Sequence, residues 1–121
     1  MLIHGKERKF MFTVSVALEL AKICPEGDLE RLGEVLSGDF TQSLPNIARF
    51  IVAMNMGYEN AKKFEDSDHV VDVITYEEVL NTDFNVIMNV LDVAMAAYEG
   101  DSKREIKTQA AQTKGKKTKV S

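Results

Sequence analysis

Hydrophobic residues recur along most of this chain at the three- and four-residue steps of an α-helix. Five apolar residues follow that spacing over 44–54, and seven follow it over 84–98. Such a repeat places the apolar side chains on one face of a helix, where they can pack into a core. The pattern predicts a mainly α protein, with one small helical domain over residues 1–100 and a disordered basic tail over 101–121.

The first residues predict a β-hairpin instead. Two apolar runs, at 2–3 and 10–12, flank a polar stretch at 4–7. Gly5 lies in that stretch and can adopt the positive φ that a tight turn requires. Because an isolated hairpin is marginal in water, we expect this one to pack against the helices that follow.

Two short helices are expected next. Thr13 or Ser15 caps the first helix, and Pro25 ends it. Asp28 caps the second helix, which the polar stretch 37–39 breaks. The apolar faces of these two helices consist of Val16, Leu20, Ile23, Leu29, Leu32, Val35 and Leu36.

A third helix should begin between residues 41 and 43, because Pro45 is tolerated in a first turn. Gly57 ends or interrupts this helix. Residues 58–64 then either extend the helix or form a separate turn, ahead of an acidic loop at 65–68. The buried face of this helix is predicted to hold Leu44, Ile47, Ala48, Ile51 and Met54.

Two further helices complete the predicted domain. Thr75 and Glu78 fit the capping-box pattern, in which a hydroxyl and a carboxylate each bind a backbone amide at the helix start. Thr82 or Asp83 caps the last helix, which should end at Gly100. The apolar face of that helix consists of Phe84, Ile87, Met88, Leu91, Ala94, Met95 and Tyr98.

Charge is divided unevenly along the chain. Residues 1–100 carry 17 acidic and 8 basic side chains, whereas residues 101–121 carry 2 acidic and 7 basic ones, and the total net charge is −4. An acidic domain repels nucleic acid, because binding there depends on cations that displace phosphate counterions. The tail holds too few large apolar residues to offset its ordering entropy, so we expect it to be solvated and disordered.

Composition excludes further classes of protein. Cys24 is the single cysteine and has no internal disulfide partner, as is usual in a reducing cytosol. No apolar run approaches the roughly 18 residues that a membrane span needs. Residues 1–9 also place charges where a secretory signal peptide would be apolar. We therefore expect a cytoplasmic protein that binds neither membrane nor nucleic acid.

Reactive side chains are few. Cys24 and a histidine can in principle form a nucleophile pair, although a small buried thiol is the commoner role. His69 lies near Asp66, Asp68 and Asp72, but this spacing matches no calcium- or zinc-binding pattern. The scattered glycines form no phosphate-binding motif. We expect no catalytic residues, no metal and no cofactor, and an enzyme with an unrecognised site is the least supported alternative.

Methionine and off-stripe apolar residues are the candidates for a binding surface. Methionine usually fills cores, but its flexible thioether also suits surfaces that accept imperfectly matched apolar partners. Phe50 and Val52 lie off the main stripe of the third helix and leave a second apolar face for a partner. The candidate partner-binding residues are therefore Phe50, Met54, Met88 and Met95.

The whole pattern resembles the tail assembly chaperones of long-tailed bacteriophages. The resemblance rests on the opening hairpin, Leu2-Ile3-His4-Gly5-Lys6-Glu7 followed by Phe10-Met11-Phe12-Thr13, and on the small acidic helical body with its Lys-rich C-terminus. It covers nearly the whole chain. It implies a non-enzymatic protein of the infected host's cytoplasm that coats the tape-measure protein during tail morphogenesis and is absent from the mature virion.

The resemblance also implies further partners. Chaperones of this kind are often made in two lengths, the longer by a ribosomal frameshift, and the added segment is thought to recruit tail-tube protein. Gly115, Lys116 and Lys117 are compatible with such a frameshift region, because their codons can form a run of adenines; a solvated basic tail is the commoner explanation. Self-association of several copies into a ring or spiral is a further expectation. The alternative function is a small acidic helical regulator that binds another protein.

Overall fold

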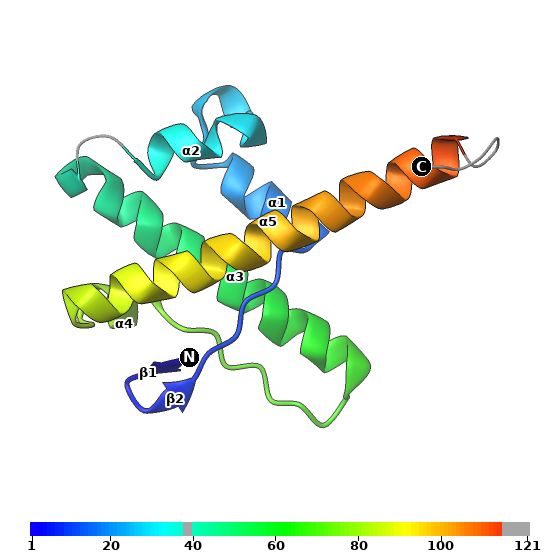
Figure 1. Ribbon diagram of the computed structural model, residues 1–121. Helices are drawn as coiled ribbons and strands as arrows, with labels where there is room; N and C mark the ends of the chain where they lie inside the picture. Colours follow the sequence, from blue (N-terminus) through cyan, green and yellow to red (C-terminus); the bar gives the residue numbers. More distant parts are fainter. Residues whose placement is uncertain (38–39, 115–121) are drawn as a thin grey trace.

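The computed structural model describes residues 1–37 and 40–114, with Phe40 and residues 101–114 described as helical backbone only. The chain is mainly α-helical with a two-stranded N-terminal hairpin, which confirms the predicted fold class. Two long helices, α3 (Phe40–Glu65) and α5 (Phe84–Lys114), cross each other (Figure 1). No helix in the described part of the chain combines the length and the apolar character needed to cross a membrane.

The hairpin pairs β1 (Leu2–Ile3) with β2 (Lys6–Glu7) in antiparallel register. His4 and Gly5 form the turn with positive φ angles of 52° and 79°, as a tight two-residue turn requires. The prediction of a second strand at 10–12 is wrong, because a two-residue turn pairs the residues directly beside it. Residues 10–12 instead run alongside α3, where the Met11 amide donates to the Met54 carbonyl at 3.0 Å.

The next segment holds α1 (Val14–Ala21), the short turns η1 (Pro25–Gly27) and η2 (Leu29–Arg31), and α2 (Leu32–Val35). The Thr13 hydroxyl accepts from the Val16 amide at 3.3 Å, so Thr13 is the cap of α1. The Asp28 carboxylate accepts from the Glu30 amide at 3.0 Å. Both predicted caps are confirmed, and α1 and α2 pack against α3.

The central helix α3 is longer than the sequence predicts. It begins at Phe40 and continues through Gly57 to Glu65, so residues 58–64 extend the helix. Gly57 does not end the helix; it lies where the N-terminal segment packs closely against α3. A Cβ atom at this position would lie 2.2 Å from the Met11 carbonyl oxygen and 2.5 Å from Cγ2 of Val16.

The last helices begin as predicted. The capping box of Thr75 and Glu78 is present at the start of α4 (Tyr76–Leu80). The Asp83 carboxylate accepts from the amides of residues 85 and 86 at the start of α5. The helix end predicted at Gly100 is wrong, because α5 continues to Lys114. The cost of one glycine inside a helix, about 1 kcal/mol, is insufficient to end it. Residues 115–121 of the predicted tail lie outside the described residues.

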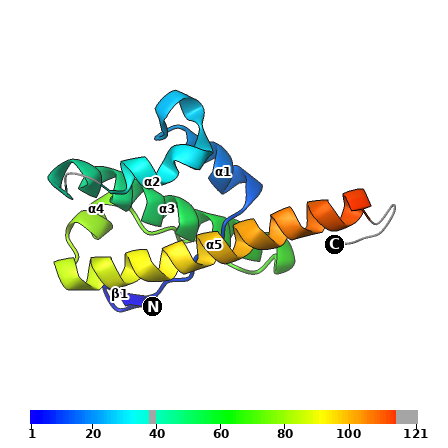
Figure 2. The same cartoon turned by 45° about the horizontal axis from the view of Figure 1, so that its top comes forward.

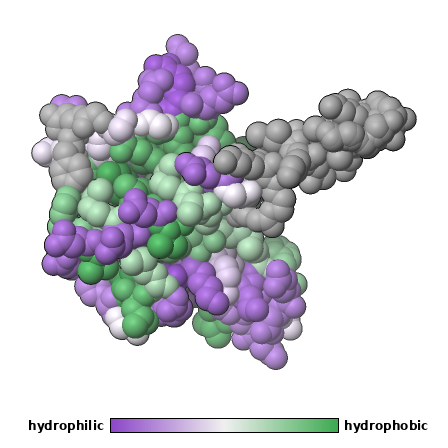
Figure 3. Space-filling view, viewed as in Figure 1, coloured by the Kyte–Doolittle hydropathy of each residue, from purple (hydrophilic) through white to green (hydrophobic). Residues whose placement is uncertain are grey.

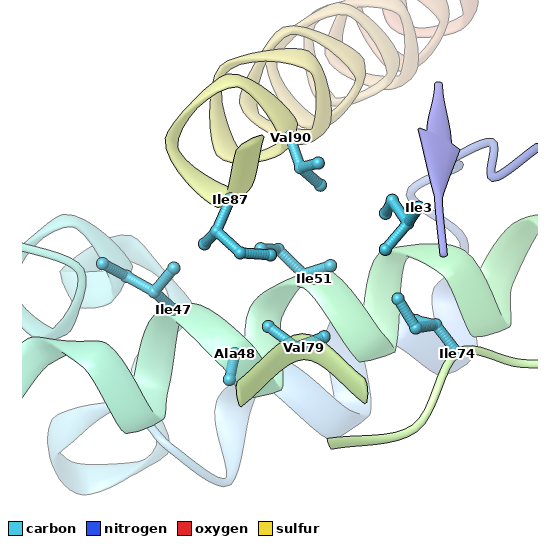
Figure 4. Packing of buried hydrophobic residues seen from close by; sticks show 8 residues of the cluster. All are labelled: Ile3, Ile47, Ala48, Ile51, Ile74, Val79, Ile87 and Val90. Atoms are coloured by element: carbon cyan, nitrogen blue, oxygen red, sulfur yellow. The ribbon is translucent and has the colours of Figure 1, made fainter. Parts of the chain in front are cut away.

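The core consists of two adjoining clusters, and α3 contributes to both. One cluster joins the hairpin, α3, α4 and α5 (Figure 4), and its buried members are Ile3, Ile47, Ala48, Ile51, Ile74, Val79, Ile87 and Val90. The other cluster joins α1, α2, α3 and α5 through Val16, Leu20, Cys24, Leu32, Phe50, Ala53, Met54 and Ala94. The middle part of α3, where α5 crosses it, is therefore buried between the elements of both clusters (Figure 2).

Candidate functional site

Two of the four predicted partner-binding residues lie in the core. Phe50 and Met54 have 0% exposed surface. The Phe50 ring meets Tyr98 of α5 edge to face, with 6.0 Å between the ring centroids. The second apolar face expected around Phe50 is thus covered by α1 and α5, and Phe50 and Met54 are corrected here to core residues. Helical spacing along α3 gave no sign that a second helix covers this side.

The other two predicted residues lie at the edge of the α5 packing surface. Met88 and Met95 are partly buried, and Met95 packs against the second core cluster. Phe84 is 49% exposed, and Leu91 is partly buried. The steps between positions 84, 88, 91 and 95 keep these side chains on one side of the helix. We call Phe84, Met88, Leu91 and Met95 the α5 edge.

A small apolar pocket adjoins the α5 edge. Its volume is about 230 Å³, and it lies between the first turns of α3, the helix α4 and the first turn of α5. Leu80 and Phe84 stand at this pocket, and each is 49% exposed. The remaining lining consists of Leu44, Ile47, Ala48, Val79, Thr82 and Ile87. Figure 3 shows apolar residues exposed among polar ones on the face that carries α5.

A larger groove of about 480 Å³ lies beside α1 on another side of α3. We call it the α1–α3 groove; its lining is Glu19, Leu20, Lys22, Ile23, Arg49, Val52, Ala53, Met56 and Tyr76. The Arg49 guanidinium lies 5.5 Å from the centre of the Tyr76 ring. Sequence reasoning missed this groove because it forms between helices that are distant along the chain.

Cys24 has the surroundings of a structural thiol. It is buried, and its Sγ atom donates to the Leu20 carbonyl at 3.2 Å. Burial raises the pKa of the Cys24 thiol, and the carboxylates of Asp28 and Glu34 raise it further. A raised pKa keeps the sulfur protonated and weakly nucleophilic.

The histidines make local polar contacts. His69 Nε2 lies 2.7 Å from Glu59 Oε1, and its backbone amide donates to the Asp66 carbonyl. His4 Nε2 lies 3.1 Å from the Glu78 carbonyl and 3.1 Å from the Thr82 hydroxyl. Among the residues that the structure describes, no group of three or more histidine, cysteine or acidic side chains is arranged to hold a metal ion.

Buried polar residues on α3 fasten two extended segments to this helix. Asn55 is fully buried; its Nδ2 donates to the Lys9 carbonyl at 2.9 Å, and its Oδ1 accepts from the Ile74 amide at 2.7 Å. One turn later, Glu59 accepts from the Asp72 amide at 3.1 Å. These bonds satisfy the buried Ile74 amide and the part-buried backbone groups of Lys9 and Asp72. Sequence reasoning missed this network; the spacing of Asn55 and Glu59, two polar residues four positions apart within an apolar helix, is the signal that could have found it.

Arg8 joins the same network from the N-terminal segment. Its side chain is 3% exposed and donates to the Asp72 carbonyl. Its Nη2 atom lies 4.0 Å from the Asp72 carboxylate and 3.9 Å from that of Glu78. The Lys6 ammonium also binds the Asp72 carboxylate. The hairpin is therefore held to the loop before α4 by charged groups.

These contacts predict a pH-dependent stability. The hydrogen bond from Lys6 holds the pKa of the Asp72 carboxyl below its usual value, with smaller help from the Arg8 charge. A lowered folded-state pKa stabilises the protein at pH values above the usual carboxyl pKa, and this contribution disappears as the pH falls through the lowered value. Asp72→Asn should therefore reduce stability near neutral pH and make no difference in acid, as urea unfolding at a series of pH values would measure.

A matched control for this pH dependence is available on α5. Asp92 is exposed and has no ion pair within the described part of the chain, so Asp92→Asn should not reproduce the pH-dependent loss. An Asp72→Asn deficit that persists unchanged at low pH would contradict the role of the Lys6 contact.

The described surface thus offers two apolar recesses and a structural polar network. The first recess, beside the α5 edge, suits an apolar side chain of a partner helix. The second, the α1–α3 groove, combines an apolar floor with a cation. No family model, no curated protein and no solved structure matches this chain.

Proposed function

We propose that this protein is a non-enzymatic tail assembly chaperone that binds the tape-measure protein through the α5 edge. The proposal starts from the resemblance of the opening hairpin, acidic body and Lys-rich end to such chaperones. The observation that supports it is the partly exposed apolar row of Phe84, Met88, Leu91 and Met95. A row of this kind is what a helix-binding surface requires.

The physical properties of the α5 edge suit a long helical partner. The resemblance implies that the tape measure is a long, helical, apolar protein, and methionine side chains can adjust to apolar partners that match imperfectly. The pocket beside Leu80 and Phe84 has room for one larger apolar side chain of the partner. The strongly acidic charge of residues 1–100 would keep a coated tape measure soluble by mutual repulsion.

A longer, frameshifted form would extend the chain beyond α5. The helix continues away from the domain for several turns after Gly100 (Figure 1), so a segment added after it would begin at a distance from the core. This geometry would leave the added segment free to capture tail-tube protein while the α5 edge holds the tape measure. The frameshift region at 115–117 lies outside the described residues. On this proposal the protein acts in the host cytoplasm and leaves before the virion is complete.

The binding surface can be tested with two charge substitutions. Met88→Asp combined with Met95→Asp should weaken binding to a purified tape-measure segment by at least about tenfold, because a carboxylate would be desolvated against apolar surface. Isothermal titration calorimetry measures the affinity, and thermal unfolding of each variant verifies that the domain remains folded.

Val93 supplies the control for this experiment. It is 45% exposed on the same helix, half a turn away from the α5 edge. Val93→Asp should leave the affinity unchanged. Equal affinities for the double variant and the parent protein would refute the site. Specific capture of a DNA-binding or signalling protein, with no affinity for tape measure, would favour the alternative of a regulator.

A further inference from the structure

Phe64 is the most exposed large apolar side chain among the described residues. It is 93% exposed, near the C-terminal end of α3. Figure 1 shows this end of α3 projecting beyond the crossing with α5 before the chain turns back. Exposed acidic residues follow immediately at 65, 66 and 68. The end of α3 therefore presents the exposed Phe64 ring next to several negatively charged side chains.

The α1–α3 groove presents the complementary chemistry. Arg8 and Arg31 each have a carboxylate within 4.0 Å. Arg49 has none among the described side chains; it donates to Asn46 Oδ1 at 3.3 Å and lies over the ring of Tyr76. In a strongly acidic domain, an arginine at an apolar groove without a carboxylate partner is poised to receive an acidic group.

Phe64 and the α1–α3 groove lie on one face of α3. Ala53 lines the groove, and Phe64 follows it by eleven residues, which is close to three full helical turns and about 16 Å along the axis. Two copies can therefore meet face to face with their α3 helices antiparallel. A two-fold axis then makes both contacts identical and closes the assembly as a dimer.

We propose that this protein forms a two-fold dimer in which Phe64 of each copy inserts into the α1–α3 groove of the other. The antiparallel register that sets Phe64 against Ala53 also brings the acidic stretch 65–68 toward Arg49. Each copy thereby supplies one aromatic insertion and one charge pair, and the groove of about 480 Å³ has ample room for a phenyl ring.

The dimer leaves the proposed tape-measure surface open. Positions 47, 51 and 54 face α5 and the core, whereas positions 49, 53 and 56 line the groove about half a turn away. Self-association through the α1–α3 groove and tape-measure binding through the α5 edge therefore use different surfaces of the domain. The dimer proposal goes beyond the proposed function and stands or falls separately.

Sedimentation equilibrium on the full chain tests the dimer. The parent protein should be a monomer–dimer system. Phe64→Ala should raise the dimer dissociation constant at least about tenfold without unfolding the monomer, since the side chain is exposed. Arg49→Glu should weaken the dimer similarly, and adding Asp68→Lys to Arg49→Glu should restore a large part of the loss by recreating the pair with reversed charges.

Two controls separate this contact from other surfaces. Val93→Ala, at an exposed apolar position on α5, should leave the dissociation constant unchanged. The Met88→Asp, Met95→Asp variant should remain dimeric even where it no longer binds tape measure. A protein that stays monomeric at all concentrations, forms larger assemblies only, or dimerises equally well as Phe64→Ala would overturn the proposal.

Discussion

Replacing Gly57 with alanine is expected to destabilise the protein by about 3 kcal/mol or more. In an ordinary helix the same change stabilises by up to about 1 kcal/mol, because alanine has the higher helix propensity. Here the new Cβ would stand 2.2 Å from the Met11 carbonyl oxygen and 2.5 Å from Val16 Cγ2. Relief requires the backbone of the N-terminal segment to move away from α3, which also breaks the bond between the Met11 amide and the Met54 carbonyl.

Gly100→Ala provides the matched comparison. Gly100 lies inside α5, and nothing would come within 4 Å of an added Cβ. Urea unfolding should therefore show opposite signs for the two glycine-to-alanine variants: a large loss at Gly57 and a small gain at Gly100. A neutral or stabilising Gly57→Ala would contradict the close packing of residue 11 on α3.

Asn55→Ala is expected to reduce the free energy of unfolding by about 2–4 kcal/mol, because one buried and one part-buried backbone group lose their partners, and a fully buried group left without a partner costs about 1–3 kcal/mol. These groups are the Lys9 carbonyl and the Ile74 amide. Arg8 also loses its 3.4 Å contact with the Asn55 side chain. The change should loosen the N-terminal segment and the loop before α4 together, which hydrogen exchange at the Ile74 amide would detect.

Asn89, which is exposed on α5, provides the control for the effect of an asparagine-to-alanine change in general. Asn89→Ala should alter the free energy of unfolding by no more than about 0.5 kcal/mol, as is usual for surface positions. Similar values for the two variants would mean that the Asn55 network contributes nothing specific.

The starts of several helices could be predicted from the sequence because they depend on interactions between neighbouring residues. A cap depends on atoms within three residues of each other, so Thr13, Asp28, Thr75 and Asp83 are readable from the sequence. The apolar stripes of the long helices are equally local. These features were enough to predict the fold class.

Long-range packing set the features that sequence reasoning missed. Gly57 reads as a helix end, yet its role depends on a chain segment more than forty residues away. Phe50 reads as off-stripe, yet α1 and Tyr98 cover it. Both errors have one cause: α3 is covered on more than one side, whereas a single helical stripe assumes that only one face is buried.

Of the two candidate surfaces, the sequence predicted residues of the α5 edge but not the α1–α3 groove. Met88 and Met95 were identified from residue type and helical spacing, and the structure leaves both partly exposed. The α1–α3 groove brings α1 and Arg49 together with Tyr76 of α4, which no local pattern predicts. Phe64 stands out only once its 93% exposure is known.

The central claim is that a tape-measure helix binds the α5 edge, and methionine-methyl NMR tests it most directly. Addition of a purified tape-measure segment should shift the methyl signals of Met88 and Met95. The signal of Met54, which is fully buried, should stay in place, and Met56 in the α1–α3 groove should respond to protein concentration rather than to the segment. Binding that shifts Met56 and leaves Met88 and Met95 unchanged, or no shift at saturating segment, would contradict the account.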